Sequence, residues 1–299
     1  MRRARLRCLP VRTRLLFAGA IALAALACGA SKKSGFDDTV DGGGGCTSGG
    51  PPIGDAGTGQ FNDDVTPSPV DTVAEVYGHS ADTLYKLDPN TKAVTIVGDF
   101  SGCSSVIDIA LNESSTLYGT TSDALWSIDK TTAACTKIAG GSYPNSLSFV
   151  PKGTVDPNVE ALVGYDGSDY IRIDPGTGTR VTIGQIGSGF QSSGDIVSVK
   201  NGPTYLTVKG ASCSYCLIEV DPKTGSMIKN WGKISHTDVF GLAFWAGSIY
   251  GFDNGGELFE VKVVGGQLTT APIAIPGAPA NLSFWGAGST TSAPVAPTK

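Results

Sequence analysis

Few side chains in this sequence belong to the types that carry out catalysis or bind metals. The 299 residues include two His, His79 and His236, seven Cys and 27 acidic residues. Four of the acidic residues occupy corners of the type Asp-Pro-x-Thr, with Lys replacing Pro in the second: Asp88, Asp129, Asp174 and Asp221. Such carboxylates could serve acid–base chemistry, but an Asp at this position also accepts hydrogen bonds from backbone N–H groups ahead of it and starts a turn. A catalytic group has no reason to recur, so we favour the turn.

The four Asp residues mark an internal repeat. The clearest copy reads Leu-Tyr-Lys-Leu-Asp-Pro-Asn-Thr (84–91). Similar segments cover 125–132, 170–177 and 217–224, and a degenerate fifth copy at 258–265 has Lys262 in the place of Asp. The copies follow one another roughly every 45 residues, and each repeat holds short β-type runs bounded by Gly, Asn, Asp or Pro. Blade-sized repeats with four short strands predict a β-propeller.

The second repeat illustrates the four expected strands, at 106–111, 116–119, 125–129 and 135–139. The first repeat begins at its second strand, 73–78, whereas the chain closes with an unpartnered inner-strand copy, Asn-Leu-Ser-Phe-Trp (281–285). Placing this last copy in the first blade closes the ring and removes free sheet edges. We therefore predict an all-β fold, a β-propeller of five four-stranded blades over residues 71–286, closed by the C-terminal strand.

The strand motifs also resemble a known family. Second strands of the type Leu-Tyr-Gly and third-strand corners of the type Ile-Asp-Pro-x-Thr-Gly are similar to those of the YVTN and quinoprotein-dehydrogenase-like propellers of bacterial surface and periplasmic proteins, over residues 71–286. The resemblance implies the fold and leaves the activity open. Redox members of that group usually have more blades and cofactor-docking Trp or Cys motifs. Neither is found in this sequence, so we expect no bound quinone and no other cofactor.

Polar residues begin the expected inner strands, where the central channel of a propeller opens. The aligned positions are Asp108, Ser146, Asp195, Gly241 and Asn281. Two carboxylates with Ser and Asn could hold a calcium ion or the hydroxyls of a sugar. The same residues could also cap the strand starts or bind ordered water in the channel, and we favour that interpretation.

Both His residues are expected on the same face of the propeller, in loops that adjoin once the ring closes. With Asp82 and Asp238, His79 and His236 could form a metal site or an acid–base pair. The sequence contains no ligand spacing that supports this, so structural or solvated His is the better interpretation.

Two functions of different class remain. The favoured one is a non-catalytic binding or scaffold module for a protein, a glycan or an ion, because the sequence lacks recognisable catalytic motifs. The alternative is an enzyme, a glycan hydrolase or lyase, that uses Asp108, Asp195 or Asp238 as channel carboxylates. Trp245 and Trp285 end inner strands; they could stack on sugars, although packing between blades explains them more simply.

The N-terminus has the pattern of an export signal. Six Arg precede the apolar run 15–27, which is too short to span a bilayer as a helix. The run ends Leu-Ala-Ala-Leu-Ala-Cys-Gly and resembles a bacterial lipobox, with Cys28 as the residue that is lipidated after removal of residues 1–27. Acyl chains on Cys28 would anchor the protein in a lipid bilayer. Gly29 stands where an inner-membrane retention signal has Asp, which favours the outer membrane.

The segments beside the propeller have different compositions. Residues 28–70 are rich in Gly, Pro and Asp and predict a flexible tether that contains Cys46, and residues 287–299 are expected to be a disordered tail. Without residues 1–27, the 22 basic residues fall to 16 against 27 acidic ones, so the net charge falls from -5 to -11. This acidity disfavours a nucleic-acid partner. We expect a monomer.

The remaining Cys residues suit an oxidising compartment. Cys213 and Cys216 lie in one predicted hairpin loop, so a local disulfide is expected; a redox-active pair would need a helix N-terminus, and none is predicted there. Cys103 and Cys135 are the other candidates. The expected strand directions place these two at opposite ends of blade two, so either they bridge and the expected register is wrong, or they stay separate.

Overall fold

The computed structural model describes residues 74–210 and 213–296. The expected export signal 1–27, the lipidation site Cys28 and the tether 28–70 lie outside the described residues.

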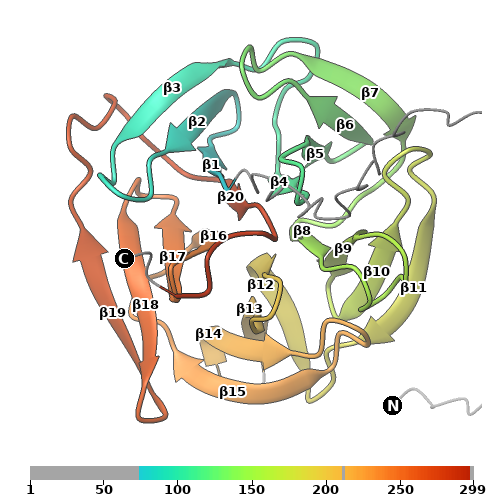
Figure 1. Ribbon diagram of the computed structural model, residues 1–299, viewed down its shortest axis with the longest axis vertical. Coiled ribbons are helices and arrows are strands. Elements are labelled where there is room, and N and C mark those ends of the chain that lie inside the picture. The colour runs from blue at the N-terminus through green and yellow to red at the C-terminus, as the bar shows by residue number, and fades with distance from the viewer. Residues whose placement is uncertain (1–73, 211–212, 297–299) are drawn as a thin grey trace, which may run out of the picture. The chain divides into compact units, whose positions relative to one another are not determined.

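The described chain forms five antiparallel sheets of four strands each, set as blades around a central axis (Figure 1). From the axis outward, blade one contains β20 (Gly286–Ser289), β1 (Val76–His79), β2 (Thr83–Leu87) and β3 (Val94–Asp99). Blade two contains β4 (Asp108–Leu111), β5 (Leu117–Thr121), β6 (Ala124–Ile128) and β7 (Cys135–Gly140). Blade three contains β8 (Leu147–Val150), β9 (Ala161–Asp166), β10 (Asp169–Ile173) and β11 (Arg180–Gln185). Blade four contains β12 (Phe190–Ser198), β13 (Thr204–Gly210), β14 (Cys213–Val220) and β15 (Met227–Lys233). Blade five contains β16 (Val239–Trp245), β17 (Ser248–Asp253), β18 (Leu258–Val264) and β19 (Gln267–Ile273).

This architecture confirms the predicted five-bladed all-β propeller, including its closure by a C-terminal strand. β20 is the innermost strand of blade one and pairs antiparallel with β1, Gly286 opposite His79 and Ser289 opposite Val76. The closing strand is not the predicted segment 281–285, however. That segment forms the loop before β20 and inserts the fully buried Phe284 between blades five and one, against Tyr85 and Phe252.

The C-terminal boundary also differs from the prediction. The expected tail 287–299 contains most of β20, and the chain beyond it is buried as far as Ala293, with Thr290 and Thr291 at 0% and 1% exposure. This segment leaves the axis at the end of β20 and touches blades one, three and four. Thr290 N donates to Glu75 O at 3.1 Å, Thr291 Oγ1 donates to Glu160, and Lys200 N donates to Thr291 O at 2.8 Å. It therefore covers the channel at the end opposite the starts of the inner strands.

The hydrophobic core is divided into layers between neighbouring blades. Each of five buried clusters draws its residues from two adjacent blades, as in the layer of blades three and four with Tyr165, Tyr170, Leu206 and Ile218. Each blade packs between two neighbouring blades. Its strands, of alternating or continuous apolar character, therefore bury side chains on both faces of the sheet. The layers fix the five inner strands around one axis, and the starts of those strands meet at one mouth.

The repeated Asp residues start turns, as the sequence predicts. The carboxylate of Asp88 accepts hydrogen bonds from the N–H groups of Asn90 and Thr91 at 2.8 and 3.2 Å. Equivalent bonds are made by Asp129, Asp174 and Asp221. Hydrogen bonds within the turn lower the pKa of Asp88, Asp129 and Asp174, because they favour the charged form. These carboxylates are structural.

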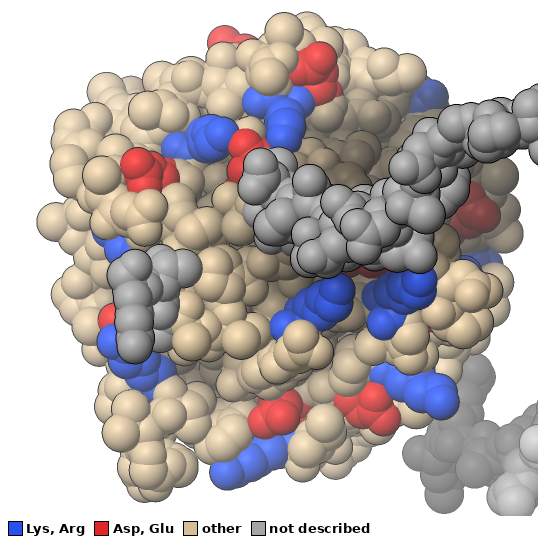
Figure 2. Space-filling view, in the orientation of Figure 1, with Lys and Arg blue, Asp and Glu red and all other residues tan. Residues whose placement is uncertain are grey.

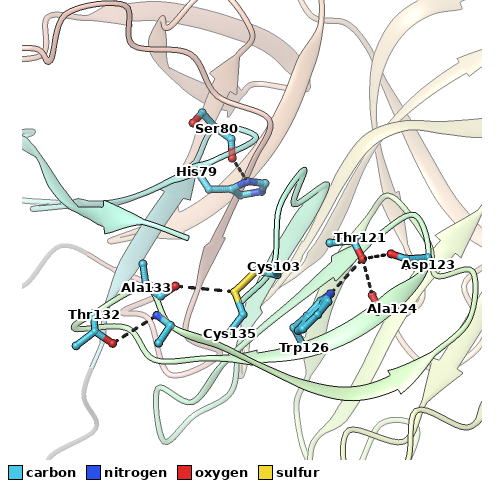
Figure 3. The surroundings of a disulfide bond; sticks show 11 residues. His79, Ser80, Cys103, Thr121, Asp123, Ala124, Trp126, Thr132, Ala133 and Cys135 are labelled. Atoms are coloured by element: carbon cyan, nitrogen blue, oxygen red, sulfur yellow. Dashed lines mark hydrogen bonds between the residues drawn. A yellow bond between two sulfur atoms is a disulfide. The ribbon is translucent and has the colours of Figure 1, made fainter. Parts of the chain in front are cut away.

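The expected disulfide and the candidate one are both present. Cys213 and Cys216 are joined with a Cα–Cα distance of 6.0 Å, and Cys103 and Cys135 with 5.6 Å (Figure 3). The two Cys residues bridge, so the expected register that placed them at opposite ends of blade two was wrong. The connecting segment that contains Cys103 runs along the start of the outer strand β7, where Cys135 N donates to Ser101 O at 2.7 Å. The bridge thus ties the crossover from blade one to the outer edge of blade two.

The described surface carries charges of both signs. Figure 2 shows Lys and Arg interspersed with Asp and Glu on one face, between broad uncharged areas. Among the described residues there is no helix long and apolar enough to cross a membrane.

Candidate functional site

The mouth of the channel is formed by one residue within, or directly before, each inner strand. Asp108, Ser146 and Asp195 are fully buried there, and Gly241 lies in the same layer, as predicted. The fifth position is held by Gly286, the first residue of β20, and not by the predicted Asn281, which is exposed in the preceding loop. The correction follows from the shift of the closing strand described above.

The two ring carboxylates link neighbouring blades. Asp108 accepts hydrogen bonds from Ile109 N at 2.8 Å and from Leu147 N, in the next blade, at 2.6 Å. Asp195 repeats the arrangement with Ile196 N at 2.6 Å and Leu242 N at 2.7 Å. Both oxygens of each carboxylate therefore accept hydrogen bonds from backbone N–H groups. Asp108 links blade two to blade three, and Asp195 links blade four to blade five.

The protonation of this pair differs from that of exposed carboxylates. Burial raises the pKa of Asp108 well above its usual range, and the nearby Asp195 charge raises it further. Burial likewise raises the pKa of Asp195. Both carboxyl groups therefore favour the neutral form more than an exposed carboxyl group does.

His79 completes the buried ring from β1, beside Gly286. Its Nδ1 lies 2.8 Å from Ser80 O and donates to it, since a carbonyl can only accept (Figure 3). Its Nε2 is buried with no hydrogen-bond partner among the described residues. Burial lowers the pKa of His79 to about 4, although the bond to Ser80 opposes the shift, so the ring is neutral at pH 7. A Cβ at Gly286 would lie 2.4 Å from Nε2 and 2.5 Å from Asp108 Oδ1.

A pocket opens directly above this ring on the propeller axis. We call it the axial pocket; its volume is about 260 Å³. Its walls come from the residue that precedes each ring position, together with one hairpin residue. They are Ile107, Asn145, Gly194, Phe240, Trp285 and Asn254. Two aromatic rings and two side-chain amides thus face one space, and Trp285 is 38% exposed. The sequence prediction missed most of this lining, which lies one residue before the predicted ring.

The two Trp residues that were expected to end inner strands, Trp245 and Trp285, have separate roles. Trp285 lines the axial pocket and Trp245 packs against the layers on both sides of blade five. Asp238, the third carboxylate of the enzyme hypothesis, is exposed in a neighbouring groove, where it accepts a hydrogen bond from Tyr215 Oη at 3.2 Å. It does not join Asp108 and Asp195 in the buried ring.

His236 lies beside two carboxylates that the sequence analysis did not single out. Its Nδ1 is 3.3 Å from Asp253 Oδ2 and 3.3 Å from Glu257 Oε2. Within the described residues, these three form the single His, Cys, Asp and Glu group whose spacing could hold a metal ion. The structure places His79 in the buried ring and His236 against the β17–β18 hairpin, so the contacts of His236 are with Asp253 and Glu257 and not with Asp82 or Asp238. Gly-Gly at 255–256 was the available signal for that hairpin.

Comparison with known proteins leaves the function open. No protein-family model matches the chain, and no curated protein matches it. Solved structures match at low identity and with TM-scores below 0.5. A chain of the hydrazine synthase of Kuenenia stuttgartiensis is 13% identical with a TM-score of 0.38, over 64% of this chain and 60% of that one. A chain of a nidogen/laminin complex is 11% identical with a TM-score of 0.47, over 73% and 82%. A PQQ-bound aldose sugar dehydrogenase of Streptomyces coelicolor is 14% identical with a TM-score of 0.39, over 67% and 78%. The chain spans less than two thirds of the hydrazine synthase chain.

Proposed function

We propose that this protein is an exported, lipid-anchored β-propeller that binds the ring of a neutral sugar in its axial pocket. The observation that carries the proposal is the lining of that pocket. The exposed indole of Trp285 and the ring of Phe240 offer apolar faces, and the amides of Asn145 and Asn254 offer donors and acceptors. Ligand sites typically combine apolar walls with a few polar groups that fix orientation, in volumes of ~300–1,000 Å³. At about 260 Å³ the axial pocket lies just below that range, which suits a single sugar ring better than a longer ligand.

The chemistry beneath the pocket favours binding over catalysis. A general acid or base must reach the proton that it transfers. Asp108 and Asp195 are fully buried, and each of their oxygens already accepts a backbone N–H. The same engagement argues against calcium in the ring, because calcium needs six to eight free oxygen ligands.

The export and anchoring parts of the proposal rest on the N-terminal sequence. The lipobox-like segment ending at Cys28 precedes a Gly- and Pro-rich spacer. The two disulfides of the propeller fit an oxidising compartment outside the cytoplasm. Gly29 after Cys28 favours the outer membrane. The lipid anchor is tested by labelling with radioactive fatty acid, and a Cys28→Ala variant that still incorporates the label would contradict it.

Trp285 gives the direct test of the binding function. The full-length protein, exported with its own signal and extracted in mild detergent, is screened against an array of neutral glycans, and hits are titrated by calorimetry. Trp285→Ala should weaken binding by ~5-fold or more, because stacking of a ring on Trp contributes about 1 kcal/mol.

A matched control separates loss of the pocket from loss of the fold. Trp231→Phe changes a Trp on the outer strand β15, whose indole bonds to Glu219 at 3.2 Å far from the axis, and it should leave binding unchanged. Equal binding by wild type and Trp285→Ala would overturn the proposal. Release of new reducing ends during the titration would instead support the glycan hydrolase.

A further inference from the structure

The cluster of His236, Asp253 and Glu257 lies beside the axial pocket. His236 comes from the loop between β15 and β16, Asp253 ends β17, and Glu257 directly precedes β18. Asn254, the residue after Asp253, lines the axial pocket. Two carboxylates and one imidazole from two separate segments thus converge at the rim of the pocket.

The distances within the cluster suit a shared ion better than direct hydrogen bonds. Both carboxylate oxygens lie 3.3 Å from the same nitrogen, His236 Nδ1. An N–H donor directs its proton at one acceptor and prefers a distance of ~2.9 Å, shorter with a charged partner. In a tetrahedral zinc site with ligands at ~2.0–2.1 Å, neighbouring ligand atoms are separated by about 3.3–3.4 Å. The three ligand atoms lie within 4.8 Å of one another.

The surroundings hold two of the three ligands in place. The His236 ring stacks on Phe259, with the ring centroids 3.7 Å apart and the planes at 1°. Asp253 uses Oδ1 to accept Glu257 N at 2.9 Å, which leaves Oδ2 directed at His236. The hairpin turns tightly at Gly256, whose φ of 84° favours glycine. Rigid support of the ligating groups is a general requirement of a metal site.

The exposure of the cluster leaves one side open. The side chains of His236 and Asp253 are 15% and 9% exposed, whereas that of Glu257 is 64% exposed. A metal bound here would keep a position for water or for an oxygen atom of a ligand. Catalytic zinc sites likewise have three protein ligands and keep the fourth position for water or substrate.

We propose that His236 Nδ1, Asp253 Oδ2 and Glu257 Oε2 bind one Zn²⁺ ion at the rim of the axial pocket, with the fourth position open. An imidazole ligand favours zinc over calcium and magnesium, which bind through oxygen. The proposal does not depend on sugar binding, since the three ligands lie outside the pocket lining.

Zinc binding by the whole protein tests the site. Full-length protein is freed of metal with a chelator, its free thiols are blocked with iodoacetamide, and ZnCl₂ is titrated by calorimetry. One equivalent should bind. Glu257→Gln should weaken that event by at least the ~10–100-fold lost with an outer-shell partner, and His236→Ala should abolish it. Because Glu257 is exposed, its variant should retain the wild-type far-UV spectrum.

Two controls make the result decisive. Asp238→Asn removes a nearby exposed carboxylate and should bind zinc like the wild type. Cobalt substitution should give a spectrum without the intense near-ultraviolet thiolate bands of a Cys site. The proposal is overturned if Glu257→Gln and His236→Ala bind zinc as tightly as the wild type, or if no equivalent binds, in which case only the direct contacts of His236 with the two carboxylates hold the cluster.

Discussion

Gly286 is the residue on which the buried ring of the channel depends. Its place between His79 and Asp108 has no room for a side chain, since an added Cβ would approach His79 Nε2 to 2.4 Å and Asp108 Oδ1 to 2.5 Å. We predict that Gly286→Ala lowers the free energy of unfolding by ~1–3 kcal/mol, the usual cost of overpacking a core. Urea denaturation measures the difference.

A second glycine provides the comparison. At Gly98 in β3 the nearest atom to an added Cβ is 3.5 Å away, an ordinary contact. Gly98→Ala should change the unfolding free energy by less than ~0.5 kcal/mol. If both variants were equally stable, the close approach of His79 and Asp108 to Gly286 would be incorrect.

The carboxyl pair in the ring makes stability depend on pH. Burial, and then the neighbouring charge, raise the pKa of Asp108, so the folded protein holds a proton that the unfolded chain releases above about pH 4. The contribution of Asp108 to the free energy of unfolding is complete below about pH 4 and declines as the pH rises through the raised pKa. We predict that Asp108→Asn is less stable than the wild type, because it loses one backbone hydrogen bond at a cost of ~1–3 kcal/mol. The difference in free energy of unfolding should become smaller between pH 5 and pH 9, because the wild type loses the contribution of Asp108 as the pH rises.

The measurement is a series of urea midpoints across that range. Asp82→Asn changes an exposed carboxyl outside the ring and should run parallel to the wild type. A constant deficit for Asp108→Asn would mean that folding does not raise the pKa of Asp108.

The ring residues show how far single positions could be predicted. The repeat alignment identified Asp108, Ser146 and Asp195, because the preceding and following strands fix their register. It missed Gly286, since Gly-Ala-Gly-Ser has no apolar strand pattern. Small residues are required in this strand because a Cβ added at Gly288 would lie only 3.0 Å from Ile109 O. Glu257 and Asp253 could not be paired with His236, because the contact is made only after the hairpin folds back.

At the level of strands, the repeated motif predicted the blades well where a turn marked them. The four Asp corners placed the third and fourth strands of blades one to four. Blade five has no such corner and turns instead at Gly265 and Gly266, both with positive φ. The prediction that 281–285 is the closing strand was wrong, because Phe284 repeats the apolar pattern of an inner strand but packs between blades.

Blades one and two are also joined by a charged network at the covered end of the channel. Glu75, just before β1, accepts hydrogen bonds from Lys86 at 2.6 Å and from Lys130 and Ser115 of blade two. Burial alone would raise the pKa of Glu75, but these three hydrogen bonds lower it to about 2. Thr290 of the C-terminal segment bonds the same residue through its backbone.

We predict a pH-dependent loss of stability in Glu75→Gln. The depressed pKa means that the stabilisation is complete above pH 4.5 and is lost as the pH falls through about 2. At pH 7 the variant should lose ~1–3 kcal/mol, typical of hydrogen bonds to a charged group, and the deficit should vanish toward pH 2. Thermal melting at pH 7, 4 and 2.5 measures it, with Glu113→Gln as an exposed control. A deficit that persisted at low pH would contradict the network.

For the molecule as a whole, β20 is the strand that turns an array of repeats into a ring. It completes blade one and contacts the inner strands of blades two and five. Without it, β1 would present an unpaired edge at the axis, and exposed strand edges recruit other chains. The segment beyond β20 covers the far end of the channel, where Lys200 N donates to Thr291 O.

Two truncations separate ring closure from channel closure. A chain ending at Trp285 lacks β20 and is expected to form oligomers or aggregates and to lose its cooperative thermal transition. A chain ending at Ser289 retains β20 but lacks the contacts of Thr290 and Thr291, so it should stay monomeric and melt at a lower temperature than the wild type. A chain ending at residue 296 serves as the control and should match the wild type. Size-exclusion chromatography and thermal melting distinguish these outcomes. If the chain ending at Trp285 were monomeric with the wild-type transition, closure by β20 would not be what holds the five blades in a ring.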